Sequence, residues 1–322
     1  MLAGVNVKIA LKRGALVAAA NWQVTIVQFL AESAFKLLLS VPVIGGVLLV
    51  VVVLGRELPE LFSPHVRESV SYLATALAAE PPALVAFLAS LAIAGLSGSV
   101  LMFIVKGGTV AVLVEGERVA GAVEAPPLRL NAVLAAARFS IDRFEAGCRR
   151  FMRRFLRLGG LLILVYVVAG AAYLGLILAW AEPAPEGQSD WTAKAGLLSG
   201  ALVAAITLVN FFYLLIQMVV VADDCSVRTA ALRMAAFVRA EARLAFGVFG
   251  VMLLVVVGAT LISLIATTSL GVIAFVPFAG LAVVPLQVAA WLFRELVFQY
   301  LGLSALGAYA GLYRRHASAQ RK

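Results

Sequence analysis

The stretch Arg149–Ala181 reads RRFMRRFLRLGGLLILVYVVAGAAYLGLILAWA and contains the two features that decide the fold. Its first nine residues include five arginines, whereas the 24 residues from Leu158 to Ala181 carry no charge. A helix needs about 20 apolar residues to cross the ~30 Å hydrocarbon core of a bilayer, so the second part predicts a membrane span. Basic residues beside a span favour the cytoplasmic side. The stretch therefore predicts a transmembrane helix that begins in the cytoplasm.

Five further uncharged runs extend this pattern along the chain: Leu37–Gly55, Ala83–Val105, Ala195–Ala222, Phe246–Ala266 and Leu270–Phe293. The chain is 63% hydrophobic and 13% charged, whereas soluble domains are roughly 45–50% apolar and 25% charged. The segments between the runs alternate in charge: one side has 23 of the 26 Lys and Arg residues with 10 acidic residues, and the other has 3 basic and 7 acidic residues. This asymmetry predicts six spans with both termini in the cytoplasm, because short basic loops resist translocation.

The sequence thus predicts an all-α, polytopic membrane helical bundle in which residues 1–322 form a single integral membrane domain. The six spans account for 139 of the 322 residues, and one membrane domain would use most of the chain, which leaves no room for a separate soluble catalytic domain. We expect the protein in the bacterial inner membrane. The pI near 9.9 would suggest nucleic acid as the partner of a soluble protein. Here the basic excess faces anionic lipid headgroups, so we expect lipid and no nucleic acid.

Residues 107–157 form the predicted cytoplasmic basic amphipathic segment. Lys106-Gly107-Gly108 is expected to end the second span, and a helix is predicted from Leu128 to Leu156. Its phenylalanines would enter the acyl boundary while its guanidinium groups bind lipid phosphates. A simple positive-inside signal next to the third span explains the same arginines. The candidate lipid contacts are Arg149, Arg150, Arg153, Arg154 and Arg157.

Three more helices are expected on the cytoplasmic face. Residues 5–36 are interpreted as a helix on the inner surface, with Glu32 and Lys36 paired four residues apart; one long helix from Trp22 is the alternative. Residues 223–243 predict a helix with Ser226 as its N-cap. Leu296–Tyr313 is either a separate surface helix or an extension of the sixth span. Between the fifth and sixth spans, Thr267-Thr268-Ser269 predicts a tight hairpin.

The fourth span carries four polar side chains at helical spacing: Thr207, Asn210, Tyr213 and Gln217. Such a face most often forms hydrogen bonds between helices, each worth ~0.6 kcal/mol. In a transporter it could instead contact substrate, between spans interrupted by Pro42 and Pro277. The uncharged runs argue against ion coupling, which usually needs a buried ionisable group.

A second candidate site lies at the inner boundary and comprises Asp223, Asp224, Arg294 and Glu295. Two adjacent aspartates could hold Mg²⁺ and a phosphate, but the longer aspartate-rich signatures of lipid enzymes are absent, so helix capping is the simpler interpretation. Motifs for zinc proteases, serine hydrolases, P-loops and dinucleotide binding are also absent. We therefore expect no catalytic residue, no metal and no cofactor.

One part of the chain resembles a known family. Val219–Val227, reading VVVADDCSV, leads into Ala230-Ala231-Leu232 and Arg239, and the chain later contains YAGLYRR at Tyr309–Arg315. These residues are similar to the membrane domain attached to some bacterial glycerophosphodiester phosphodiesterases and to its uncharacterised stand-alone six-helix relatives. The likeness covers about the last third. The resemblance implies an all-helical six-span architecture; this chain lacks a phosphodiesterase domain, so no enzymatic activity is implied.

Taken together, the residues favour a non-enzymatic inner-membrane scaffold or accessory subunit that binds lipid or a protein partner, which could be a second copy of the chain. Two other classes remain open. One is a transporter or permease subunit that uses the polar face of the fourth span. The other is a lipid-modifying membrane enzyme with its chemistry around Asp223, Asp224 and Arg294.

Overall fold

The computed structural model describes residues 6–54, 75, 81–180, 188–274 and 279–320. Every regular element in these ranges is an α-helix, and the described residues contain no strand. Six of the helices are long and apolar enough to cross a membrane. The predicted all-α polytopic fold is therefore confirmed, and the chain is a multi-pass membrane protein.

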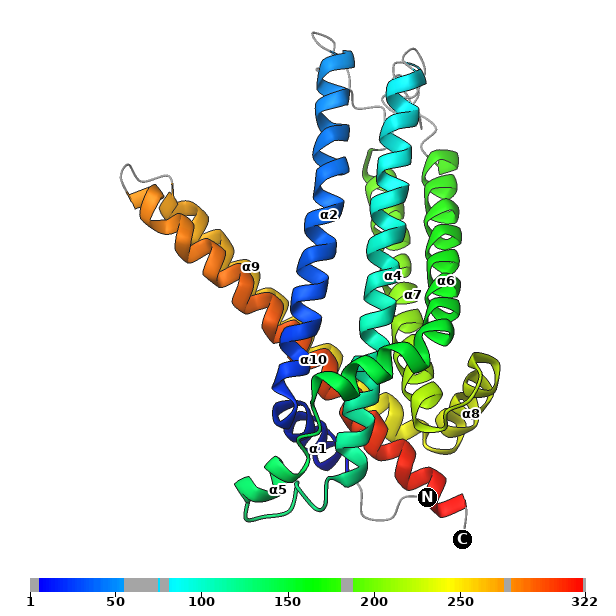
Figure 1. Ribbon diagram of the computed structural model, residues 1–322. Helices are drawn as coiled ribbons and strands as arrows, with labels where there is room; N and C mark the ends of the chain where they lie inside the picture. Colours follow the sequence, from blue (N-terminus) through cyan, green and yellow to red (C-terminus); the bar gives the residue numbers. More distant parts are fainter. Residues whose placement is uncertain (1–5, 55–74, 76–80, 181–187, 275–278, 321–322) are drawn as a thin grey trace. The chain divides into compact units, whose positions relative to one another are not determined.

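The helices follow one another along the chain as labelled in Figure 1. The six candidate spans lie within the six longest described helices. In order, the described helices are α1 (Val7–Ala20), α2 (Trp22–Leu54), α4 (Pro81–Val119), α5 (Leu130–Ala135), α6 (Ile141–Trp180), α7 (Gln188–Ala222), α8 (Val227–Ala240), α9 (Ala242–Ala274) and α10 (Ala279–Gln320).

The chain forms two compact units, and several long helices contribute to both. The first unit comprises residues 1–31, 104–155 and 214–322, and the second comprises residues 32–103 and 156–213. Within the first unit, α10 packs along α1 and α9, while α8 contacts α9 and α5 contacts α1. The side-by-side course of α9 and α10 can be followed in Figure 1.

The first unit is held together by a close crossing of α1 over α10. A Cβ added to Gly14 would lie only 2.9 Å from the Cα of Ala308, and one added to Gly307 would lie 3.1 Å from the Cα of Gly14. Contacts this short require glycine, because a side chain would push the helices apart. The Tyr300 hydroxyl also donates to the carbonyl of Ala15 at 3.0 Å.

The second unit uses its glycines differently. Gly98 lies against the ring of Phe35, Gly46 against Phe87 and Gly159 against Phe103, so that an added Cβ would overlap each ring. Gly98 therefore marks a close contact between α4 and an aromatic ring of α2.

Several expected helix boundaries were wrong. One inner-surface helix was expected over residues 5–36, but the structure has α1 and then one continuous helix from Trp22, which was the alternative. The expected pairing of Glu32 with Lys36 is present, at 3.0 Å. Helix α9 continues through residues 267–269, where a hairpin was expected. Helix α10 runs unbroken to Gln320, so the extension interpretation of residues 296–313 is the correct one. Pro42 lies inside α2, and Pro277 lies outside the described residues.

The second span does not end at Gly107-Gly108. Helix α4 continues to Val119, and these glycines lie where it crosses α6. A Cβ on Gly108 would lie 2.6 Å from the sulfur of Cys148, and one on Gly147 would lie 3.1 Å from the Cα of Gly108. Close packing between α4 and α6 therefore explains these glycines, and the expectation that they end the helix was wrong.

The predicted helix Leu128–Leu156 is interrupted, because α5 ends at Ala135 and α6 begins at Ile141. The buried side chain of Asn21 accounts for the interruption. Its Oδ1 accepts from the backbone N–H groups of Arg138 and Phe139 at 2.8 and 3.2 Å, and its Nδ2 donates to the carbonyl of Ala136 at 3.0 Å. These bonds satisfy backbone groups that a continuous helix would have paired internally.

Candidate functional site

A buried arginine–carboxylate cluster joins three helices of the first unit. Arg13 on α1 is 3% exposed, and its Nε donates to Glu117 of α4 at 2.8 Å. Its Nη1 donates to Glu124 at 2.7 Å. From α10, Arg314 reaches the second Glu117 oxygen at 3.1 Å, and Arg315 reaches Glu124 at 2.8 Å. Below, "the arginine–carboxylate cluster" means these five residues.

The same arginines cap the C-terminal end of α4. The last carbonyls of a helix have no partner within it, and positive charge is favourable there. Arg13 donates to the carbonyls of Ala120 and Gly121, each at 2.7 Å, and Arg314 donates to that of Arg118 at 2.8 Å. The cluster therefore satisfies both the carboxylates and the backbone of α4.

Glu124 is the member of the cluster that lies beyond the end of α4. Burial alone would raise the pKa of its carboxyl, but its backbone hydrogen bond and the guanidinium groups of Arg13 and Arg315 outweigh burial and hold the pKa below its ordinary value. Gly311 leaves space for the cluster, because an added Cβ would lie 3.1 Å from a Glu117 oxygen. These contacts explain part of the Tyr309–Arg315 sequence by packing alone.

The Asp223-Asp224 pair forms the turn between α7 and α8. Asp224 has a φ of 47°, in the left-handed region that aspartate tolerates better than most residues. The Cys225 N–H donates to the carbonyl of Val220 at 3.3 Å, which closes the end of α7. Ser226 then caps α8 by accepting from the N–H of Thr229 at 3.2 Å, which confirms the predicted N-cap.

The two aspartates bind different helices. Asp224 receives hydrogen bonds from Arg150 and Arg154 of α6, and these hydrogen bonds lower the pKa of its carboxyl. Asp223 accepts from Arg233 of α8 at 2.6 Å and from the hydroxyl of Tyr313 on α10. Both carboxylates are therefore occupied by cations of the protein itself. In the described part of the chain, no group of three or more His, Cys, Asp or Glu side chains is placed to hold a metal ion.

The structure does not bring Arg294 and Glu295 to these aspartates. Arg294 and Tyr313 lie on the same helix, 19 residues apart, which corresponds to roughly 28 Å along its axis. The Arg294 guanidinium instead lies over the ring of Phe298, 5.7 Å from the ring centre. The four residues considered together in the sequence occupy two separate places.

The arginines of α6 divide into paired and unpaired groups. Arg149 binds Glu145 of its own helix, and Arg150 and Arg154 bind Asp224. Arg153 and Arg157 are exposed and make no ion pair with any residue that the structure describes. The phenylalanines among these arginines were expected to contact lipid. Phe151 and Phe155 do not, because the protein itself buries them, at 5% and 0% exposed.

The polar side chains of α7 have different surroundings. Thr207 donates to the carbonyl of Val203 in its own helix at 2.7 Å, and Asn210 accepts from the hydroxyl of Tyr166 on α6. Tyr213 and Gln217 are buried. The Nε2 of Gln217 has no hydrogen-bond partner among the described residues. Asn210 therefore contacts another helix, as the packing interpretation requires.

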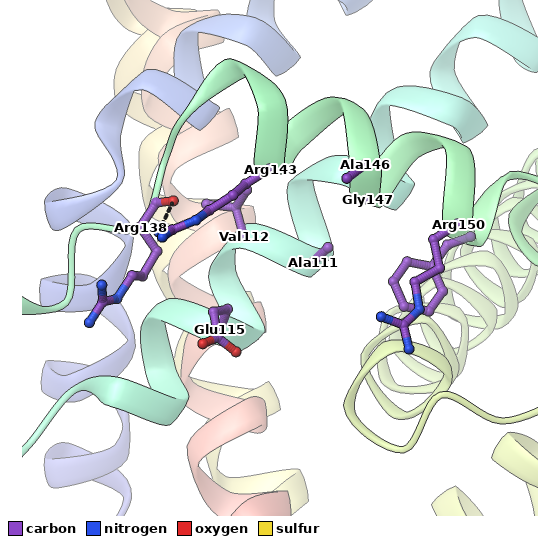
Figure 2. A pocket seen from close by; sticks show the side chains of 9 residues that line it. Ala111, Val112, Glu115, Arg138, Arg143, Ala146, Gly147 and Arg150 are labelled. Carbon is purple, nitrogen blue, oxygen red and sulfur yellow. Dashed lines mark hydrogen bonds between the residues drawn. The ribbon is translucent and has the colours of Figure 1, made fainter.

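A cavity of about 220 Å³ lies between α4 and α6 in the first unit. Figure 2 shows Arg143 extended towards Arg138, with Arg150 at the opposite end. The Arg143 Nη1 donates to the Arg138 carbonyl at 3.4 Å, and the Arg138 Nε is buried with no partner among the described residues. Glu115 lies in the wall and pairs with Arg118 at 3.2 Å. The remaining lining residues are Ala111, Val112, Ala146, Gly147 and Phe151.

A second cavity of about 320 Å³ lies between α8 and α10. Asp223, Arg233, Tyr313 and His316 contribute polar groups to its wall. The rings of Tyr313 and His316 pack against Phe237, each 5.5 Å from its ring centre. The His316 Nε2 lies 3.0 Å from the amide nitrogen of Gln320. Tyr313 and His316 were not among the candidates from the sequence, because nothing in the local sequence places them opposite Asp223.

Comparison with protein-family models, with curated proteins and with solved structures found no match for the chain.

Proposed function

We propose that this protein is a bacterial inner-membrane protein, with both termini in the cytoplasm, that binds anionic lipid headgroups and acts as a non-enzymatic scaffold or accessory subunit. The observation that carries the proposal is the exposed, unpaired state of Arg153 and Arg157 on α6, among the described residues. A phosphate is the natural partner for such a guanidinium beside an apolar span. We also propose that the chain belongs to the family of six-helix membrane domains that its last third resembles.

The contacts of Asp223 and Asp224 support a structural role for this pair. An enzyme that used them to hold a metal and a phosphate would need carboxylates free of the protein's own cations. Here Arg150 and Arg154 bind both oxygens of Asp224, and Arg233 and Tyr313 bind one oxygen of Asp223. In the same way, the bond between Asn210 and Tyr166 supports helix packing rather than a substrate pathway in the fourth span.

Native mass spectrometry of the full chain, extracted in a mild detergent, tests the lipid proposal. We expect phosphatidylglycerol to bind more tightly than phosphatidylcholine. Each arginine near an anionic surface contributes about 1 kcal/mol, so Arg153→Gln with Arg157→Gln should weaken phosphatidylglycerol binding by about thirtyfold. The matched control is Arg228→Gln with Arg239→Gln, which removes two exposed charges from α8. Equal binding of both lipids would refute the proposal, as would an equal loss in the control.

A lipid-modifying enzyme is the second candidate, favoured by the cavity that Tyr313, His316, Arg233 and Asp223 line. A protonatable ring beside an arginine and a carboxylate is a common arrangement for acid–base chemistry on a phosphate ester. Incubation of the purified protein with mixed phospholipids, followed by mass spectrometry of the products, tests this function. A product that forms with the natural protein and not with His316→Gln would establish it; unchanged lipids would exclude it for those substrates.

A further inference from the structure

The cavity between α4 and α6 has the chemistry of a phosphate site. Two of its arginines, Arg138 and Arg143, make no ion pair with a described residue. An anion in the cavity would pair with their guanidinium groups. We infer that this cavity binds the phosphodiester of one phospholipid headgroup.

The charges around the cavity are consistent with one phosphodiester. Arg138, Arg143 and Arg150 contribute three positive charges, but Arg150 also binds Asp224. Glu115, the one carboxylate among the lining residues, is paired with Arg118. Arg138 and Arg143 therefore remain to bind the ligand, and a phosphodiester carries a single negative charge that two guanidinium groups can hydrogen-bond from two directions.

The size of the cavity limits what it can hold. Its volume of about 220 Å³ is below the ~300–1,000 Å³ of pockets that enclose drug-sized ligands. The small side chains of Ala111 and Ala146, and the lack of one at Gly147, leave the space that forms the cavity. The close crossing of α4 and α6 keeps its walls near each other and so limits its volume. A headgroup fits and a whole lipid does not, so the acyl chains must remain outside.

The surroundings favour a membrane lipid over free phosphate. Helix α6, which provides most of the lining residues, continues into an apolar span. Within the first unit, the large apolar side chains of Leu134, Ile141 and Met152 are 58%, 75% and 37% exposed. Acyl chains can contact such a surface while the headgroup is bound by arginine, as in other interfacial helices. The site thus gives the proposed lipid function, on which it rests, a specific location.

Lipid titration followed by native mass spectrometry tests the inference on the full chain. We expect one phosphatidylglycerol to bind more tightly than those that follow. Arg138→Gln with Arg143→Gln should weaken this first binding by about tenfold, since each guanidinium donates charge-assisted hydrogen bonds. Ala146→Leu fills the cavity without changing the charge and should weaken the first binding similarly. Arg228→Gln with Arg239→Gln, on α8, should leave it unchanged.

The outcomes separate this inference from the proposed function. If phosphatidylglycerol binds no better than phosphatidylcholine, the lipid function fails and the cavity inference with it. If Arg153→Gln with Arg157→Gln weakens binding but the cavity variants do not, the function stands and the cavity inference is overturned. If inorganic phosphate or glycerophosphoglycerol competes as well as the intact lipid at equal ionic strength, the inference that the bound phosphodiester belongs to a membrane lipid is overturned.

Discussion

Replacing Arg13 by methionine should destabilise the first unit more than any exposed substitution. Arg13 makes five hydrogen bonds, two to carboxylates and three to backbone carbonyls, from a side chain that is 4% exposed. Removing one partner of a buried ion pair costs about 3–5 kcal/mol, because the other charge stays buried. At about 2–4 °C per kcal/mol, Tm should fall by roughly 6–20 °C.

Thermal unfolding in detergent, followed by tryptophan fluorescence, measures this change. Arg13→Lys keeps the charge but offers three donors in place of five, so its Tm should lie between those of Arg13→Met and the natural protein. In Arg13→Met with Glu117→Leu both buried charges are gone, and the double variant should be more stable than the sum of the single changes predicts. Arg314, at 39% exposed, can then turn towards solvent.

The control for this experiment is Arg228→Met, which removes an exposed arginine from α8. Surface substitutions usually change stability by less than about 0.5 kcal/mol, so its Tm should shift by no more than about 2 °C. A similarly small shift for Arg13→Met would refute the reasoning. Strict additivity of the Arg13 and Glu117 changes would show that the two residues do not act as a buried pair.

Three further predictions follow from single contacts. Gly14→Val should force apart the backbones of α1 and α10, whose Ala308 lies in contact, and lower stability by about 1–3 kcal/mol. Asn21→Ala leaves two backbone N–H groups without an acceptor and should expose the segment between α5 and α6 to faster trypsin cleavage, which can be followed by mass spectrometry. Because the folded protein lowers the pKa of Glu124 and Asp224, their contribution to stability should be complete above the ordinary carboxyl pKa and lost as pH falls through the lowered pKa of the folded state. Tm measured from neutral to acidic pH should therefore fall less in Glu124→Gln.

The sequence predicted those parts of the structure that depend on local pattern. The apolar runs predicted the spans, and Ser226 predicted the start of α8, since a serine before a helix has a local reason to cap it. The pairing of Glu32 with Lys36 was also predictable from spacing. The cap and the ion pair each depend on residues within one or two turns of each other, and each span depends on one continuous run of residues.

The arginine–carboxylate cluster could not be predicted in this way, because 104 residues separate Arg13 from Glu117 along the chain. A signal was nevertheless present: each is a charged residue in a largely apolar segment, where an isolated charge is costly without a partner. The break between α5 and α6 was missed for the same reason. Its cause, Asn21, lies 115 residues before Ala136.

The capping of α4 has a consequence for how the protein is made. Arg118 and Arg314, which meet at the end of α4, are 196 residues apart in the chain. At 5–20 residues per second, a ribosome needs roughly 10–40 s to cover that distance. During this interval Glu117 has Arg13 but lacks its α10 partner, so the early helices must wait in a partly assembled state. Completion of the first unit is therefore coupled to insertion of the final helix.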